Sequence, residues 1–462
     1  MYCAFFVRKI STFLLAMAIA RYAGIDSFGL YCLALVLMDF GIRFAVFGTD
    51  ILIVRNLSAG ESDALKEAGN AYAWRIVSTI LSYPLLILTA SLISDSSQLP
   101  YIVAIMGLGM ITQTLGSLHF ALIQGKERVD LYALATGMAS LVGLIIGLIA
   151  LKTGMGIAGI AATYSLRGVF SLLTGIIICR HLKQNVSICP HFRSIFSLLR
   201  KSAPIAANRL LTLFYLGSGI LILQHYYNET VVGQFASSMK IFEACAALGM
   251  MTMVAAFPTI SRLRSESTEQ LKRVTTTLIQ YFGWLGLPLS LIVGMNSEKL
   301  LVLIFGSEIS GHTLPLTILM LAIPFSLSHA IVERLSYAAN DQKRAFMVRI
   351  SGVLVNLILI FITINNTTYL APAIGLLGAE IAMFCIFLPQ WKKYVYGLGF
   401  IKTILPPVTA SFIAFIAVAL LKDHLGWYRG FVFAGIIMII YFMQKPLSKY
   451  FASLKSPSRT TS

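Results

Sequence analysis

Charged side chains occur in the middle of several long apolar stretches of this sequence. Asp39 and Arg43 are four residues apart in one stretch, and Lys240 and Glu243 are three apart in another. Residues at these spacings share a face of an α-helix. Ionisable side chains within membrane helices are rare and usually face a bundle interior or a water-filled cavity on a substrate or ion pathway. The two pairs are therefore candidates for a transport site.

The charges in these stretches are mostly positive. Arg167 and Arg209 have no acidic residue within one helical turn, which makes them the better candidates for an anionic ligand. The planar guanidinium suits phosphate, and a basic interior concentrates anions. The sequence therefore favours a phosphate-bearing or otherwise anionic substrate. The basic residues of this predicted interior are Arg43, Arg167, Arg209 and Lys240, with Arg8, Arg75 and Arg349 nearer the inner ends, and the acids are Asp39, Glu243 and Glu380.

These residues also have purely structural interpretations. The two mid-stretch pairs can be ordinary ion pairs within one helix. The basic residues nearer the inner ends lie within a turn or two of the membrane surface and can extend their charged ends to it. Asp50 is expected at the interface, near Arg55.

The composition places the chain in a membrane. Of its 462 residues, 57% are hydrophobic and 12% charged, and the mean hydropathy is +0.81. A soluble domain has about 25% charged residues. The apolar runs are long enough to cross a bilayer core as helices, and too uniformly apolar for the alternating strands of a barrel. We predict an all-α integral membrane protein with 12–14 transmembrane helices.

Fourteen apolar ranges are candidate spans, and twelve spans is the alternative because the last two are the weakest. The ranges are 4–21, 28–53, 72–94, 100–123, 130–151, 156–179, 203–223, 231–258, 273–295, 314–332, 346–365, 370–390, 400–421 and 427–444. With the N-terminus and C-terminus in the cytoplasm, most Lys and Arg residues between spans fall on the cytoplasmic side, as membrane proteins require. This distribution accounts for the net charge of +17 without a nucleic-acid partner.

An internal repeat relates the two halves of the sequence. Gly29 opens the second span and Gly233 opens the eighth, and an acid follows each after ten residues, Asp39 and Glu243. Spans 1–6 and 7–12 are therefore interpreted as two six-helix lobes around a central cavity, where such transporters bind substrate near mid-membrane. The predicted domains are an N-terminal lobe (1–180), a basic cytoplasmic linker (181–202), a C-terminal lobe (203–395) and two extra spans with a basic tail (396–462).

The sequence contains no motif that supports catalysis or cofactor binding. The six cysteines form no CxxC motif, and Gly154-x-Gly156-x-x-Gly159 has neither the preceding strand nor the following acid of a dinucleotide site. Gly143-x-x-x-Gly147 is typical of helix packing. His119 and His329, in equivalent places of the two halves, are interpreted as structural. We predict no enzymatic activity, no metal and no cofactor.

Several segments resemble the polysaccharide-export (Wzx-type) flippases. These flippases share an Ala-Arg, a short turn, a Tyr-Gly or Phe-Gly that opens the second span, and an Arg at the inner face. The matching residues here are Ala20-Arg21, Ala23-Gly24, Phe28-Gly29 and Arg55. VVGQFASSMKIFEACAAL and AAFPTISRL are similar to the opening and the Pro-x-x-Ser-Arg end of the family's eighth span, and LVLIFGSEI and GLLGAEIA match later motifs. The resemblance covers spans 1–12, with motifs shared by the wider multidrug/oligosaccharidyl-lipid/polysaccharide exporter superfamily.

The resemblance implies a transporter that flips a polyprenyl-pyrophosphate-linked oligosaccharide by alternating access. The cargo would be an O-antigen, capsule or exopolysaccharide repeat unit, moved across the bacterial cytoplasmic (inner) membrane. Its implied partners are this lipid-linked glycan, membrane lipid and other polysaccharide assembly proteins. The pyrophosphate would bind Arg43, Arg167, Arg209, Lys240, Arg75 and Arg8, and gating or ion coupling would use Asp39, Glu243 and Glu380.

Two alternatives remain open. A multidrug cation antiporter of the same superfamily would depend on Asp39 or Glu380, and the basic interior argues against it. A membrane glycan polymerase would need catalytic residues in large outer loops, whereas the predicted outer loops are short.

Overall fold

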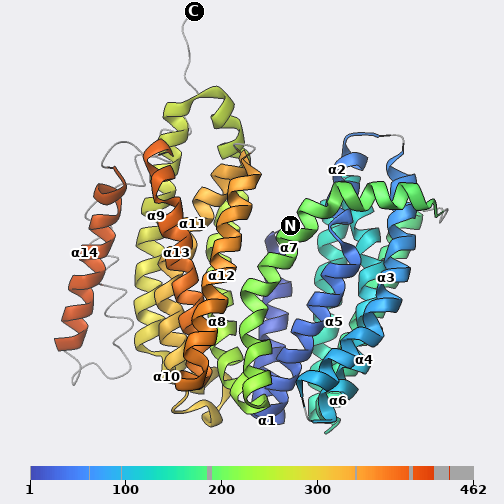
Figure 1. Ribbon diagram of the computed structural model, residues 1–462, viewed down its shortest axis with the longest axis horizontal. Coiled ribbons are helices and arrows are strands. Elements are labelled where there is room, and N and C mark those ends of the chain that lie inside the picture. Colours follow the sequence, from blue (N-terminus) through green and yellow to red (C-terminus); the bar gives the residue numbers. More distant parts are fainter. Residues whose placement is uncertain are drawn as a thin grey trace, which may run out of the picture. The chain divides into compact units, whose positions relative to one another are not determined.

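A computed structural model shows that the protein consists of long helices (Figure 1). It describes residues 2–61, 63–94, 96–184, 190–338, 341–394, 399–420 and 436. Nearly all of these residues lie in helices, and they include no strand. The elements are α1 (Tyr2–Val46), α2 (Thr49–Ser58), α3 (Ala64–Ile93), α4 (Gln98–Gly125), α5 (Val129–Lys152), α6 (Gly156–His181), α7 (Phe192–Tyr226), α8 (Glu229–Glu266), α9 (Thr268–Met295), α10 (Ser297–Phe305), η1 (Ser307–Ile309), α11 (Leu314–Ala338), α12 (Gln342–Thr367), η2 (Thr368–Leu370), α13 (Ala371–Tyr394) and α14 (Gly399–Leu420).

The prediction of a helical membrane protein is confirmed. Within the part of the chain that the structure describes, nine helical ranges are long and apolar enough to span a bilayer. Two of them are long enough for two spans: Phe6–Val46 contains a kink, and Lys343–Pro389 covers both α12 and α13. The predicted span 427–444 lies outside the described residues, apart from Ile436.

Helix α1 is interrupted at Gly24, between the first two predicted spans. Gly24 has φ 86° and ψ 166°, a conformation that glycine adopts without steric cost. The break removes the helical partner of the next backbone N–H, that of Ile25, which instead donates to Glu308 Oε2 at 3.0 Å. The Nε of Arg21 donates to the carbonyl oxygen of Ile304 at 2.9 Å. The end of α10 and η1 therefore hold this kink.

The second predicted span, 28–53, is wrong at its inner end. Helix α1 stops at Val46, Phe47 and Gly48 take positive φ values of 47° and 73°, and α2 begins at Thr49. A Cβ added at Gly48 would lie 2.9 Å from the Ile205 side chain of α7. The close approach of α7 and the left-handed turn explain the break, and neither is visible in the hydropathy of the segment.

The chain forms two compact units. The first comprises Met1–Lys240, Leu301–Pro315 and Arg349–Ala379, and the second comprises Ile241–Leu300, Leu316–Val348 and Glu380–Ser462. In the first unit α4 packs against α6 and α3, and α1 packs against α5; in the second, α9 packs against α14. These units follow other boundaries than the predicted domains, and the two six-helix lobes stay a prediction.

The two glycines of the internal repeat meet inside the first unit. A Cβ added at Gly29 of α1 would overlap the backbone oxygen of Glu229 in α8, and one added at Gly233 would overlap the backbone oxygen of Ile25. The contact is reciprocal, because each glycine faces the residue four positions before the other. Small residues let helix backbones approach this closely. The repeat in the sequence therefore corresponds to a crossing of two helices with local two-fold character.

Candidate functional site

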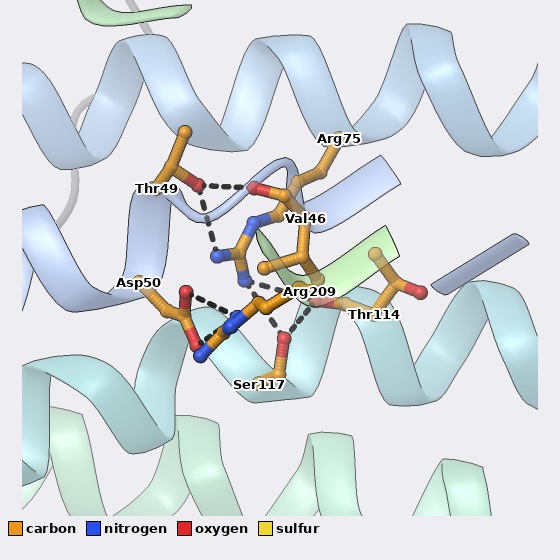
Figure 2. A network of polar contacts seen from close by, with 7 residues as sticks. All are labelled: Val46, Thr49, Asp50, Arg75, Thr114, Ser117 and Arg209. Atoms are coloured by element: carbon orange, nitrogen blue, oxygen red, sulfur yellow. Dashed lines mark hydrogen bonds and ion pairs between the residues drawn. The ribbon is translucent and has the colours of Figure 1, made fainter. Parts of the chain in front are cut away.

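Arg75 lies at the centre of a polar network inside the first unit (Figure 2). Its side chain comes from α3 and is fully buried. Nη1 donates to the carbonyl oxygen of Thr114 at 3.1 Å and to Ser117 Oγ at 2.8 Å, both on α4, and Nη2 donates to Thr49 Oγ1 on α2 at 3.2 Å. The predicted reach of Arg75 to the membrane surface is therefore wrong: the guanidinium is held within the bundle.

An ion pair adjoins this network. Arg209 Nη1 on α7 lies 2.8 Å and 3.0 Å from the two carboxylate oxygens of Asp50 on α2 (Figure 2). Asp50 attracts the charge of Arg75 and Arg209 repels it, so the three groups interact. We expected Asp50 to lie near Arg55. Instead it supplies the acidic partner for Arg209, whose own helix has none within one turn. Four helices, α2, α3, α4 and α7, are joined by these contacts.

A cavity of about 220 Å³ lies beside the network, between α1, α2, α4, α5 and α6. Its charged lining residues are Arg8, Asp50 and Arg167, and since Asp50 is already paired with Arg209, the cavity has a positive excess. The buried Oε1 of Gln113 in its wall has no hydrogen-bond partner among the described residues. The remaining lining residues are mostly polar: Ser117, Phe120, Ala121, Gln124, Tyr132, Thr136, Ala139, Ser140 and Ser171.

Arg167 faces this cavity from α6. Its guanidinium lies 5.8 Å from the centre of the Tyr164 ring, a cation–π distance. A Cβ added at Gly143 would lie 3.0 Å from Cδ of Arg167, so the glycine of the predicted packing motif makes room for this side chain. Within the described residues, no carboxylate forms an ion pair with Arg167. The guanidinium is therefore placed to take an anion.

The other predicted site residues lie in two places. Asp39 is exposed and interacts electrostatically with Tyr164. Tyr31 interacts electrostatically with both Lys240 and Arg167. These groups of the first unit surround two buried tyrosines. Arg43 is partly buried in the last turn of α1. Glu243 is partly buried and belongs to the second unit.

Glu380 forms a buried pair in the second unit. His329 Nδ1 on α11 lies 2.8 Å from Glu380 Oε2 on α13, and the two side chains are 7% and 2% exposed. The interpretation of His329 as a structural residue overlooked this partner. The two residues are 51 positions apart, and the available signal was that each is a titratable group in an apolar span.

Comparisons with known proteins identify the family. A sequence model of the polysaccharide biosynthesis protein family matches residues 18–313. The chain belongs to this family. A relative from Shigella dysenteriae named "Putative O-antigen transporter" is 24% identical over 281 residues, which cover 60% of this chain and 70% of the relative.

Solved structures show the same fold. The Lipid II flippase MurJ in an inward closed conformation has a TM-score of 0.77 at 15% identity and covers 98% of this chain and 99% of its own. An inward-facing multidrug resistance MATE transporter has a TM-score of 0.66 at 12% identity, covering 87% and 95%. A mutant of the Vibrio cholerae MATE transporter VcmN has a TM-score of 0.61 at 15% identity, covering 84% of this chain and 94% of its own. This family member therefore has the fold of membrane transporters.

Proposed function

We propose that the protein flips a polyprenyl-pyrophosphate-linked oligosaccharide from the inner to the outer leaflet of the bacterial cytoplasmic membrane by alternating access. The observation that carries the proposal is the positively charged cavity of the first unit, found in a member of a polysaccharide biosynthesis family. The relative's name, which specifies O-antigen, favours a surface-polysaccharide repeat unit as the glycan.

The cavity suits the charged part of such a cargo. Arg167 and Arg8 line it and would contact the pyrophosphate directly, since guanidinium groups bind phosphate oxygens in a bidentate manner. Arg75 and Arg209 are engaged with protein groups and would add positive potential from behind. A cavity of about 220 Å³ has room for a pyrophosphate group, and the sugars would extend outside it. Arg43 and Lys240 would act on the part of the cargo outside this cavity.

Coupling to an ion gradient is assigned in this proposal to the acidic residues. Glu380 and His329 form a buried pair in which both side chains can gain or lose a proton. Asp39 and Glu243, at equivalent places of the repeat, would gate the pathway. A proton bound at Glu380 would change the charge of the second unit without disturbing the guanidinium groups of the first.

The direct test replaces Arg167. We expect Arg167→Ala to lower surface polysaccharide about tenfold or more in cells that lack the native gene, because one charge-assisted contact is worth about 1.5–3 kcal/mol. Arg167→Lys should recover part of the activity. The matched control is Arg128→Ala, which removes an exposed arginine paired with Asp130 outside the cavity. Polysaccharide at the wild-type level in Arg167→Ala, with equal protein in the membrane, would exclude Arg167 from the site.

A multidrug antiporter is the second candidate. It is favoured by the likeness to MATE transporters together with the buried acid Glu380. This function predicts resistance to cationic drugs when the protein is overproduced, lost in Glu380→Gln, and no effect on surface polysaccharide. If overproduction of the protein leaves drug sensitivity unchanged, the antiporter function is excluded and the proposed flippase function remains.

A further inference from the structure

The first part of α7 is a separate amphipathic segment, residues 192–203. Pro204 follows it inside α7, and proline bends a helix because it lacks the N–H and its ring clashes with the preceding turn. Figure 1 shows α7 as a bent helix: one part runs across the ends of neighbouring helices of the first unit and the other runs alongside them. The proposed transport of a lipid-linked oligosaccharide assigns no role to this segment.

One side of the segment is fixed to the protein. Leu198 is 2% exposed and packs into a cluster that contains Leu52, Ile53 and Leu118. The backbone N–H of His191, just before the segment, donates to Asn70 Oδ1 at 3.1 Å. Lys201 Nζ lies 3.5 Å from Glu67 Oε1 on α3. The orientation of the segment about its own axis is therefore set by contacts with α2, α3 and α4.

Two phenylalanines lie on a different side of the segment. Phe192 is 84% exposed and Phe196 is 64% exposed, and their spacing of four places them on one face. No described residue covers them. Two apolar rings at this exposure would be unfavourable in water. The segment runs across the ends of helices that are long and apolar enough to span a membrane, so we expect the bilayer surface at this level.

The adjoining face is basic. Arg193, Ser197 and Arg200, at spacings of four and three, form a second exposed row beside the phenylalanines. An amphipathic helix with phenylalanine on one face and arginine on the next is typical of helices that lie in the membrane interface, where basic residues attract anionic headgroups. Charge complementarity therefore favours anionic bilayer lipid as the occupant.

We propose that residues 192–203 lie in the headgroup layer, with Phe192 and Phe196 inserted at the acyl boundary and Arg193 and Arg200 bound to anionic lipid phosphates. The contacts of Leu198 and His191 would then couple this lipid contact to α2 and α3, which carry the Arg75 network. The proposal concerns bilayer lipid and does not depend on the identity of the cargo.

Depth is tested by fluorescence in the full-length protein. Phe196→Trp and Ser197→Trp place the same fluorophore at adjacent exposed positions on the two faces. Both are reconstituted into nanodiscs of phosphatidylcholine and phosphatidylglycerol with bromines on the acyl chains, and the unsubstituted protein supplies the background of native tryptophans. We expect the added emission of Phe196→Trp to be quenched at least twofold more than that of Ser197→Trp. Equal quenching, or stronger quenching of Ser197→Trp, would overturn the insertion.

Lipid charge is tested in the same system. Quenching of Phe196→Trp should increase with the fraction of phosphatidylglycerol, and Arg193→Gln/Arg200→Gln should remove this dependence. The control is Arg128→Gln/Arg344→Gln, which removes two exposed arginines that are each paired with an acid elsewhere. If the dependence is absent in the parent variant, or persists after Arg193→Gln/Arg200→Gln, anionic lipid is not the partner.

Discussion

Each compact unit contains a cluster of charged or titratable side chains with at least one buried member, and the two clusters differ in kind. The network of the first unit contains two guanidinium groups, Arg75 and Arg209, and one carboxylate, Asp50. The pair of the second unit contains one imidazole and one carboxylate, His329 and Glu380. Guanidinium groups keep their charge at all physiological pH values, whereas both members of the second pair can change protonation.

The difference suggests a division of roles. Fixed positive charge is suited to hold an anionic ligand, and it needs many hydrogen bonds to be stable away from water. Arg75 has three such bonds, from two helices other than its own. A protonatable pair is suited to respond to an ion gradient and can stay neutral as a unit. The predictions below test this contrast.

The largest effect is expected for Arg75→Ala. The change removes the buried donor of three hydrogen bonds and leaves a void, so we expect the unfolding midpoint in detergent to fall, with a loss of roughly 3 kcal/mol or more. Arg75→Lys should lose less, because it keeps the charge but not the forked geometry. A melting curve of Arg75→Ala that overlays that of the wild type would show that the network is not structural.

A smaller effect is expected for Arg209→Ala. It leaves Asp50 without its ion-pair partner, but the two side chains are 32% and 26% exposed, so solvent compensates in part. We expect a loss of about 1–2 kcal/mol in the same thermal assay. The double variant Arg209→Ala/Asp50→Asn should be closer to the wild type than Arg209→Ala. Simple additivity of the two substitutions would contradict a direct coupling.

Glu380→Gln should change function more than stability. The amide keeps the size of the side chain and one hydrogen bond to His329, so we expect a stability loss below about 1.5 kcal/mol. Transport into proteoliposomes should lose its dependence on the pH gradient, while binding of pyrophosphate stays within about twofold of the wild type. Transport that keeps its full response to the gradient would remove this pair from the coupling role.

The smallest effect is expected at an exposed ion pair. Arg128 and Asp130 are 48% and 62% exposed, and solvent screens such surface pairs, so this pair contributes little to stability. The hydrogen bond to Asp130 raises the pKa of Arg128 further above its usual value, so this arginine stays charged throughout the working range. Arg128→Ala should leave melting and transport unchanged. A large loss would mean that surface charge, rather than burial, sets the order of these effects.

Much of the helical architecture was predictable from local sequence. The kink at Gly24 falls between two predicted spans, and the repeat glycines Gly29 and Gly233, matched by spacing alone, contact each other. The break at Phe47–Gly48 was missed because it depends on the approach of α7, whose contacting residue Ile205 lies more than 150 positions further along the chain. Hydropathy averages over a segment and does not detect a single left-handed residue.

The amino-acid sequence by itself determined that the protein lies in lipid, that it is helical, and that its apolar stretches carry an excess of basic residues. These follow from composition and from runs of apolar residues, which each segment carries alone. Only the tertiary structure decided which charges meet. Asp50 pairs with Arg209 across 159 positions, Glu380 pairs with His329 across 51, and Arg75 became a buried residue rather than a surface one. Partners from different helices are chosen by packing, because a buried charge is stable only where another element brings a complementary group within hydrogen-bond distance.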